Sequence, residues 1–481
     1  MTAGNDFRTS NAFRRAICVA LLSSAGLVLC AGNAVAQIRK SVGPAPKGTK
    51  AAPAPSQAAP AARPAGTATT GTPQDPNALP PNFEPPGQPN PLLNINKPLL
   101  TAKQAQDLRR EVGNYPSTLR NGVLDAQSRA QLPKIATLVI HQLSMPENRE
   151  KLPDLVDKLM RDINQAAILQ KNPQVSRQFR QAFLKEIAAR SAELLDNNLH
   201  VRLQGVIILG SLYVVEPTRD NEGEAYLGSL DPLVQVLEDK TQPAEMKILA
   251  AKGLERIAAT ARPSAAQKLT MSRALIRELE QTDTHRWYQM RLAETLGSVD
   301  YATDDRGRPT IASALTAVVA DNNRHCLVRS QAARSLGRIP LDAQVNVGNV
   351  AFSVAHFASQ MAEEYNNDPG APHWRNCYWN VYLAFKPLTT AERSRDAGLL
   401  AKVEKAPHTA HKSAVNDAYQ QMLPLARHAI NAASPARMPE ANLTSLAEWL
   451  TKNQPVDYRV APNTPPIATQ QVSKDDQKPA G

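Results

Sequence analysis

Apolar side chains recur at helical spacing along most of the chain, from Leu99 to about Tyr458. In one such segment, Leu152, Val156 and Leu159 fall on the same side of a helix and form an apolar stripe. Short turns containing Asp, Asn, Pro or Gly separate the segments, and almost no strand pattern occurs between them. The pattern therefore predicts an all-α protein. The first helices are expected at 101–112, 125–143, 147–169 and 172–195.

Four later segments share one sequence pattern. The clearest copy is "VRSQAARSLGRI", which begins at Val328, and related copies begin at Val201, Met246 and Tyr288. These starting positions lie 45, 42 and 40 residues apart. Repetition with this period is typical of arrays built from helix pairs.

The residue types in the pattern have physical reasons. The apolar positions of each copy share one helical face, which must be buried. Small residues in the middle, such as Gly205 and Ala332, allow a neighbouring helix to approach closely. Arg329 occupies a position that is basic in two other copies, which indicates a structural role. Gly337 is expected to help end its helix before Pro340.

An apolar helix precedes each of the last three copies, so each unit is predicted to be a helix pair that buries its face by stacking. These first helices are expected at 230–239, 265–279 and 310–320. Two further pairs are expected at 347–365 with 374–385 and at 390–404 with 413–432. A helix at 442–452 would cover the end.

The pattern V-R-x-x-A-A-x-x-L-G-x-I resembles the HEAT repeat of the armadillo-like class, strongly over 198–340 and more weakly over 101–455. The resemblance implies an α-solenoid of stacked antiparallel helix pairs that binds protein partners as a scaffold or adaptor. Some HEAT-like proteins are enzymes, such as deoxyhypusine hydroxylases and phycobilin lyases. The His-Glu dipeptides of the hydroxylases do not occur in this sequence. We therefore expect no enzymatic activity and no cofactor.

The N-terminus has the pattern of an export signal. Arg14 and Arg15 precede a short apolar segment, and Ala34 to Ala36 are small residues suited to cleavage after Ala36. The sequence predicts an exported protein, periplasmic or extracellular, with no transmembrane span after cleavage. An uncleaved membrane anchor is the alternative.

Composition divides the rest of the chain. Fifteen of its 38 prolines lie between Pro44 and Pro98, in a Pro/Ala-rich stretch too poor in apolar residues to fold. The predicted organisation is a signal peptide (1–36), a disordered linker (37–98), an N-terminal helical region (99–197) and HEAT-like repeats (198–340). C-terminal helical repeats with a cap (341–458) and a disordered tail (459–481) complete it.

The net charge of +11 is relevant to the kind of partner that the chain binds. A basic exported protein suits an anionic envelope polymer as an alternative to a protein partner. Nucleic acid is not expected as a partner, because the predicted export signal would remove the chain from it.

Aromatic residues and arginine, which binding hot spots favour, concentrate in "HWRNCYWNVYLAF" at 373–385. Alternatively, Trp374, Tyr378, Val381 and Phe385 share one buried face. The candidate binding residues are His373, Trp374, Arg375, Tyr378 and Trp379, with Trp287 from an earlier unit.

Histidine and cysteine recur near the starts of the second helices. A row of imidazoles is expected from His200, His285, His325 and His373, but we predict no metal site, because no carboxylate or cysteine lies at ligand spacing. Cys326 and Cys377 lie in consecutive units and could form a disulfide. The repeat register separates them by about five residues, or ~7 Å along the helix axis.

Overall fold

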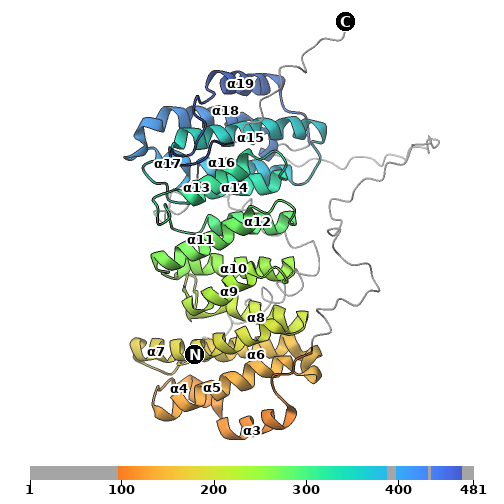
Figure 1. Ribbon diagram of the computed structural model, residues 1–481, viewed down its shortest axis with the longest axis vertical. Helices are drawn as coiled ribbons and strands as arrows, with labels where there is room; N and C mark the ends of the chain where they lie inside the picture. The colour runs from red at the N-terminus through yellow and green to blue at the C-terminus, as the bar shows by residue number, and fades with distance from the viewer. Residues whose placement is uncertain (1–95, 387–396, 432–434, 468–481) are drawn as a thin grey trace, which may run out of the picture. The chain divides into compact units, whose positions relative to one another are not determined.

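The computed structural model describes residues 96–386, 397–431 and 435–467, which are mostly helical (Figure 1). All of them belong to one compact unit, Pro89–Gly481. The predicted signal peptide and nearly all of the predicted linker lie outside the described residues. The α-helices are α3 (Ala102–Val112), α4 (Tyr115–Asn121), α5 (Ala126–His141), α6 (Leu152–Gln165), α7 (Pro173–Glu193), α8 (Leu199–Ser211), α9 (Leu230–Glu238), α10 (Ala244–Thr260), α11 (Ala265–Leu279), α12 (Arg286–Leu296), α13 (Thr310–Ala320), α14 (Cys326–Arg338), α15 (Val347–Asn367), α16 (Trp374–Phe385), α17 (Gly398–Lys402), α18 (Lys412–Asn431) and α19 (Glu440–Lys452).

Local capping fixes where several helices begin. The Asp125 carboxylate accepts a hydrogen bond from the backbone N–H of Ser128 at the start of α5. Ser264 forms a capping box with Gln267 at the start of α11. These contacts satisfy backbone donors that have no partner inside the helix. The local sequence therefore determines where these helices begin.

The second helix of each expected pair contacts the second helix of the next. In the series α8, α10, α12, α14, α16 and α18, every helix packs against its successor, as Figure 1 shows for the helices in chain order. The first helices α9, α11, α13 and α15 contact one another in the same way. Within a unit, α9 packs on α10, α11 on α12 and α13 on α14.

The repeated pattern produces the core. Its first residues, Val201, Met246, Tyr288 and Val328, are all buried. Its second residues are buried as well, although they are polar: Arg202, Lys247, Gln289 and Arg329. Each of these four makes a hydrogen bond within the fold, which keeps a buried polar group satisfied. The structural role predicted for Arg329 is confirmed by its bond to the Val319 carbonyl at 2.9 Å.

Glycine in the pattern permits close contact between second helices. A Cβ on Gly253 of α10 would lie 2.9 Å from Gly210 Cα of α8. A Cβ on Gly337 would lie 2.6 Å from the Ala384 carbonyl oxygen of α16. Gly337 is the penultimate residue of α14, which ends at Arg338 before Pro340, as expected. It is small because α16 packs against it.

A β-hairpin interrupts the helices after α8, contrary to the near absence of strand pattern in the sequence. β1 (Tyr213–Val215) pairs antiparallel with β2 (Glu224–Ala225). Arg180 of α7 donates hydrogen bonds to the carbonyls of Val214 and Tyr213, both at 2.9 Å. The hairpin therefore depends on a buried side chain from another helix, which no local pattern reveals.

The folded chain continues past the predicted end of the repeats. We expected disorder from residue 459, but Val460 and Ile467 are buried. The Asn349 side chain of α15 donates hydrogen bonds to the carbonyls of Asp457 and Arg459, at 2.9 and 2.7 Å. This asparagine anchors the segment against α15. The part of the predicted tail from 468 onward lies outside the described residues.

Candidate functional site

The aromatic segment at 373–385 forms α16, and its two sides differ. Trp374 and Tyr378 are buried together with Val381 and Phe385, so the interpretation as a packed helix face is confirmed for these four. Arg375 is exposed. Trp379 is half-buried and stacks on Tyr382, with ring centroids 5.8 Å apart. Tyr378 thus belongs to the core, while Arg375 and Trp379 lie nearer the surface.

A continuous row of contacts crosses the N-terminal ends of α12, α14 and α16. The Arg286 guanidinium lies 6.0 Å from the centroid of the Trp287 ring, and its Nη1 is 3.3 Å from Nε2 of His325. The His325 ring contacts the His373 ring at 5.6 Å. His373 packs on Trp374 at 4.3 Å. We call this set of five residues the N-terminal rim.

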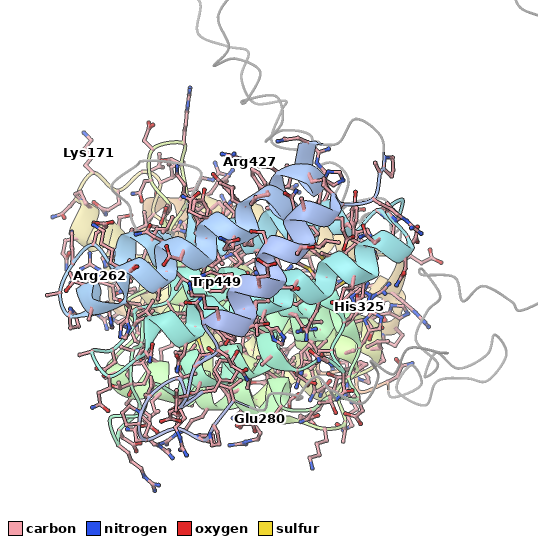
Figure 2. All side chains as sticks on the ribbon, turned by 90° about the horizontal axis from the view of Figure 1, so that it is seen from above. Lys171, Arg262, Glu280, His325, Arg427 and Trp449 are labelled. Atoms are coloured by element: carbon pink, nitrogen blue, oxygen red, sulfur yellow. The ribbon has the colours of Figure 1, made fainter. Side chains whose placement is uncertain are left out.

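The rim contains three of the six candidate residues: Trp287, His373 and Trp374. Trp287 is 36% exposed, a high value for tryptophan, whereas Trp374 is buried and donates a hydrogen bond to the Asp368 carbonyl. Figure 2 shows His325 at the edge of the packed helices. Arg286 was not among the candidate residues. It follows the N-cap His285 in the same way that Cys326 follows the N-cap His325. Alignment of the helix starts would have found it.

Histidine at the start of these helices has a local structural function. His285 and His325 are the N-caps of α12 and α14, and their Nδ1 atoms accept hydrogen bonds from the backbone N–H of Trp287 and Leu327. His373 is the N-cap of α16 and makes no side-chain capping bond. Of the expected row of imidazoles, His325 and His373 lie in contact, and His285 stands at the equivalent position of α12. His200 instead follows the N-cap of α8, Asn198.

Two thiols lie directly behind the rim. Cys326 is the first residue of α14, and Cys377 is in the first turn of α16. Both are free and buried in this structure. The separation of ~7 Å expected from the repeat register stays a prediction. Asn380 of α16 donates hydrogen bonds to the side chains of Ser330 and Gln331 of α14, both at 3.5 Å, so the two helices pack directly on each other.

The environment makes the two thiols unequal. The hydrogen bond from Cys377 lowers the pKa of Cys326, and hydrogen bonds with His325 and His373 lower it further. His325 Nδ1 is 3.6 Å from the Cys326 sulfur. Burial raises the pKa of Cys377, and the hydrogen bond to Cys326 raises it again. The pKa of Cys326 is thus lowered and that of Cys377 raised.

A carboxylate near Cys326 also has a shifted pKa. Burial raises the pKa of Glu364, on α15, and the negative charge of Cys326 adds to this effect. In the described part of the chain, no group of three or more His, Cys, Asp or Glu side chains is arranged to hold a metal ion.

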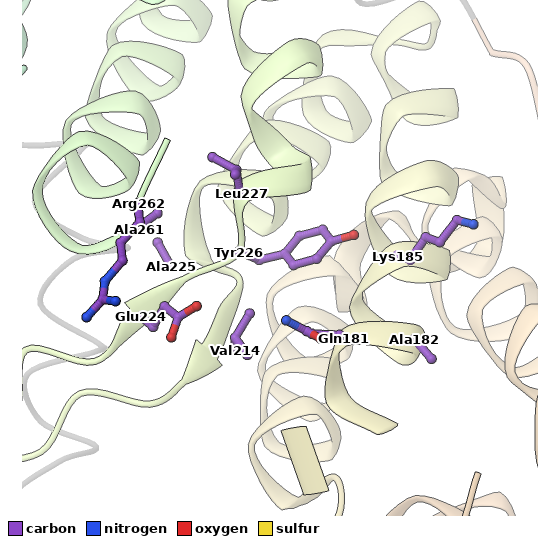
Figure 3. Close-up of a pocket in the computed structure, with 10 residues that line it drawn as sticks. All are labelled: Gln181, Ala182, Lys185, Val214, Glu224, Ala225, Tyr226, Leu227, Ala261 and Arg262. Carbon is purple, nitrogen blue, oxygen red and sulfur yellow. The ribbon is translucent and has the colours of Figure 1, made fainter. Parts of the chain in front are cut away.

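An open cleft of about 480 Å³ lies elsewhere, between α7, the hairpin and the residues after α10 (Figure 3). Its lining includes Lys185, Tyr226 and Arg262. The one carboxylate among its lining residues, Glu224, forms an ion pair with Arg177. This cleft gathers fewer interacting polar groups than the rim.

No family model, curated protein or solved structure that was compared with the chain matches it. Among the described residues, none of the helices is long and apolar enough to cross a membrane.

Proposed function

We propose that the chain is an exported, non-enzymatic α-solenoid scaffold of the HEAT type that binds a protein partner at the N-terminal rim. The observation that carries this proposal is the contact row from Trp287 through Arg286, His325 and His373 to Trp374. Tryptophan and arginine are the residues that most often dominate protein–protein binding energy.

The helix contacts support the scaffold. Each second helix from α8 to α18 contacts the next, and the first helices from α9 to α15 do the same. An array of this kind brings the starts of several helices to one edge, so side chains from α12, α14 and α16 form a single surface although they are far apart in sequence.

Charge pairing favours a protein over an anionic polymer. Many arginines in the middle of the chain have a carboxylate partner within 4 Å, which lowers the net attraction for a polyanion. These pairs are Arg177–Glu224, Arg180–Glu216, Arg273–Asp305, Arg277–Glu238, Arg291–Glu255, Arg308–Asp304 and Arg324–Asp321.

The test is a capture experiment with the purified chain immobilised and an envelope extract of the source cells applied. Three forms are compared: the natural chain, Trp287→Ala, and Val456→Ala, which removes another exposed apolar side chain that is not one of the five rim residues. A protein retained by the natural chain and Val456→Ala but lost with Trp287→Ala supports the proposal.

Two outcomes overturn the proposal. Equal retention by all three forms excludes the rim as the binding surface. Retention of a polymer that is released when salt rises from about 0.05 to 0.5 M, with no protein retained, supports the anionic polymer instead.

A further inference from the structure

Three of the six exposed large apolar side chains in the described residues belong to two segments near the start of the fold. They are Val123, Ile168 and Leu169, which are 49%, 63% and 64% exposed. Val123 lies just after α4, while Ile168 and Leu169 lie in the turn after α6. Single exposed apolar residues are ordinary on a protein surface, but a contiguous group marks a binding surface.

Backbone hydrogen bonds join the turn after α6 to the end of α4. The Ala167 N–H donates to the Leu119 carbonyl at 2.7 Å, and the Leu169 N–H donates to the Arg120 carbonyl at 3.0 Å. Ala167 has a φ of 59°, the one positive value of a non-glycine residue in the described part of the chain. Such a conformation persists only where the surrounding structure imposes it. The fold therefore fixes the exposed positions of Ile168 and Leu169.

The same junction brings Val123 close to the turn. The Cβ of Ala167 leaves no room for a side chain on Gly122, so these two residues touch. Val123 and Ile168 are the next residues of the two segments. The three apolar side chains therefore extend from one place, and we call Val123, Ile168 and Leu169 the apolar tip.

Positive charge flanks the apolar tip. Within three residues of the tip along the chain there are two cations, Arg120 and Lys171, and one carboxylate, Asp125. Both cations are exposed, and Figure 2 shows Lys171 at the outer edge, pointing away from the packed helices. The Asp125 carboxylate is engaged in the cap of α5, where it accepts the Ser128 N–H. The tip thus combines apolar side chains with a charge that complements an anionic surface.

We propose that the apolar tip and its two flanking cations dock the folded chain on an anionic lipid surface. Ile168 and Leu169 enter the boundary between the headgroups and the acyl chains, while Arg120 and Lys171 contact the headgroups. Burial of apolar side chains and attraction between basic side chains and anionic lipid are the two contributions that hold peripheral proteins on membranes. This inference is independent of the protein partner proposed for the N-terminal rim.

A protein partner, including a second copy of the chain, fits this surface less well. Protein interfaces are depleted in lysine, and leucine and valine are rare among their hot spots. A standard interface uses roughly 20–30 residues on each side, whereas the tip offers three exposed apolar side chains. Binding to lipid grows with the apolar area and charge that enter the surface, and needs no partner of fixed shape.

The experiment places a fluorescent probe in the tip of the full chain. Leu169→Trp puts the probe in the tip, and the matched control, Val456→Trp, puts it at another exposed apolar position. Each protein is mixed with vesicles of phosphatidylcholine containing about one third phosphatidylglycerol, with bromine on the acyl chains. Bromine quenches tryptophan that reaches the acyl region. Attachment of the chain by another segment, and the four natural tryptophans, are common to both proteins.

We expect the brominated vesicles to lower the emission of the added tryptophan about twofold in Leu169→Trp and to leave it unchanged in Val456→Trp. Adding Ile168→Asp to Leu169→Trp should reduce this quenching several-fold, because a carboxylate then replaces a side chain that enters the lipid. Arg120→Gln with Lys171→Gln should also reduce it, as should vesicles without phosphatidylglycerol. The helical circular dichroism should stay unchanged, since these side chains are exposed.

Three results would overturn the proposal. Equal quenching in Leu169→Trp and Val456→Trp would mean that the tip does not enter lipid. Quenching that persists without phosphatidylglycerol and with both cations replaced would mean that the surface recognised is not anionic. A shift of the Leu169→Trp emission to shorter wavelength as the protein concentration rises, with no vesicles present, would mean that a second copy of the chain covers the tip.

Discussion

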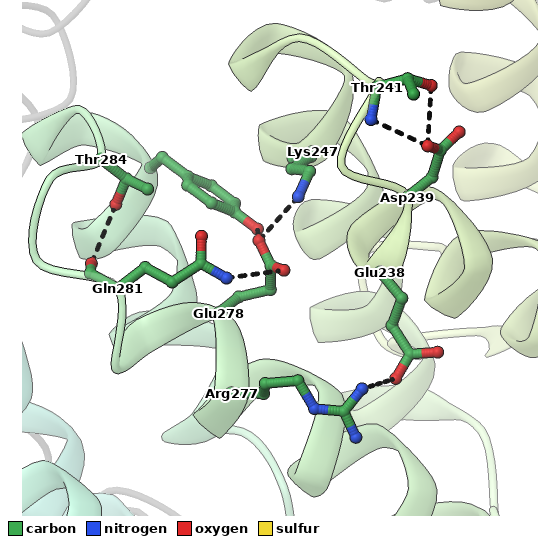
Figure 4. Close-up of polar contacts among 9 residues, drawn as sticks. Glu238, Asp239, Thr241, Lys247, Arg277, Glu278, Gln281 and Thr284 are labelled. Atoms are coloured by element: carbon green, nitrogen blue, oxygen red, sulfur yellow. Dashed lines mark hydrogen bonds and ion pairs between the residues drawn. The ribbon is translucent and has the colours of Figure 1, made fainter.

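The buried ion pair between α10 and α11 gives the sharpest test of the packing described here. Lys247 Nζ lies 2.8 Å from Glu278 Oε2, and the Tyr288 hydroxyl donates to the same oxygen at 2.7 Å (Figure 4). The three residues are 7%, 3% and 1% exposed. Burial and the hydrogen bond to Glu278 raise the pKa of Tyr288, so the phenol remains a donor. Replacement of Lys247 by methionine keeps the apolar stem but leaves the Glu278 carboxylate buried without its cation.

We expect Lys247→Met to lower the free energy of unfolding by about 3–5 kcal/mol, the cost of an unpaired buried charge. Lys247→Met with Glu278→Gln should recover much of this loss, because the amide is neutral and still accepts from Tyr288. The matched control is Arg277→Ala, which breaks the pair with Glu238 beside it, also drawn in Figure 4. That pair is exposed, so its loss should cost less than about 1 kcal/mol.

Urea unfolding followed by circular dichroism measures these free energies, and amide hydrogen exchange locates the change. The loss of protection should concentrate in α10, α11 and α12, the helices that carry the three residues. Two results would refute the reasoning. Lys247→Met could prove no more harmful than Arg277→Ala, or the double variant could be no more stable than Lys247→Met alone. Either would mean that Glu278 is not a desolvated charge in the folded protein.

Three further predictions concern other packing features. Gly337→Ala should lower the free energy of unfolding by about 1–3 kcal/mol, because its Cβ would meet the α16 backbone at 2.6 Å. Gly370→Ala is the control, since no atom lies closer than 3.6 Å to the added Cβ. Thermal unfolding of the two variants measures the difference. Arg180→Met should abolish protection of the hairpin amides in hydrogen exchange, since its guanidinium donates hydrogen bonds to the two carbonyls of Val214 and Tyr213 there. Unchanged protection would contradict this. Burial raises the pKa of Tyr458 to about 12, while an unfolded tyrosine ionises near pH 10. The stability that this protonated phenol contributes is full below pH 10 and is lost as the pH rises toward 12. Over that range the free energy of unfolding, measured by urea titration, should fall by about 2–3 kcal/mol more in the natural chain than in Tyr458→Phe. An equal fall in both proteins would count against the prediction.

Helix positions could be predicted because their signals are local. The expected ranges 265–279, 310–320 and 374–385 are those of α11, α13 and α16. Ser264 shows why: a capping box in adjacent residues fixes the start of α11 without help from the rest of the fold. The buried sides of these helices follow equally from apolar spacing.

Features that depend on the meeting of distant segments could not be predicted. The hairpin exists because Arg180 reaches it from α7, and the segment after residue 458 is held by Asn349 of α15. The position of Cys377 relative to Cys326 likewise depends on how α16 packs against α14.

The starts of α12, α14 and α16 are equivalent positions that differ in the side chain after the N-cap. Each helix has histidine at its N-cap, namely His285, His325 and His373. The residue that follows is arginine in α12, cysteine in α14 and tryptophan in α16. Since the backbone position is the same, the difference in side chain cannot come from the needs of the helix. A guanidinium, a thiol and an indole thus gather along one edge, and any specific function of this array should depend on these three positions.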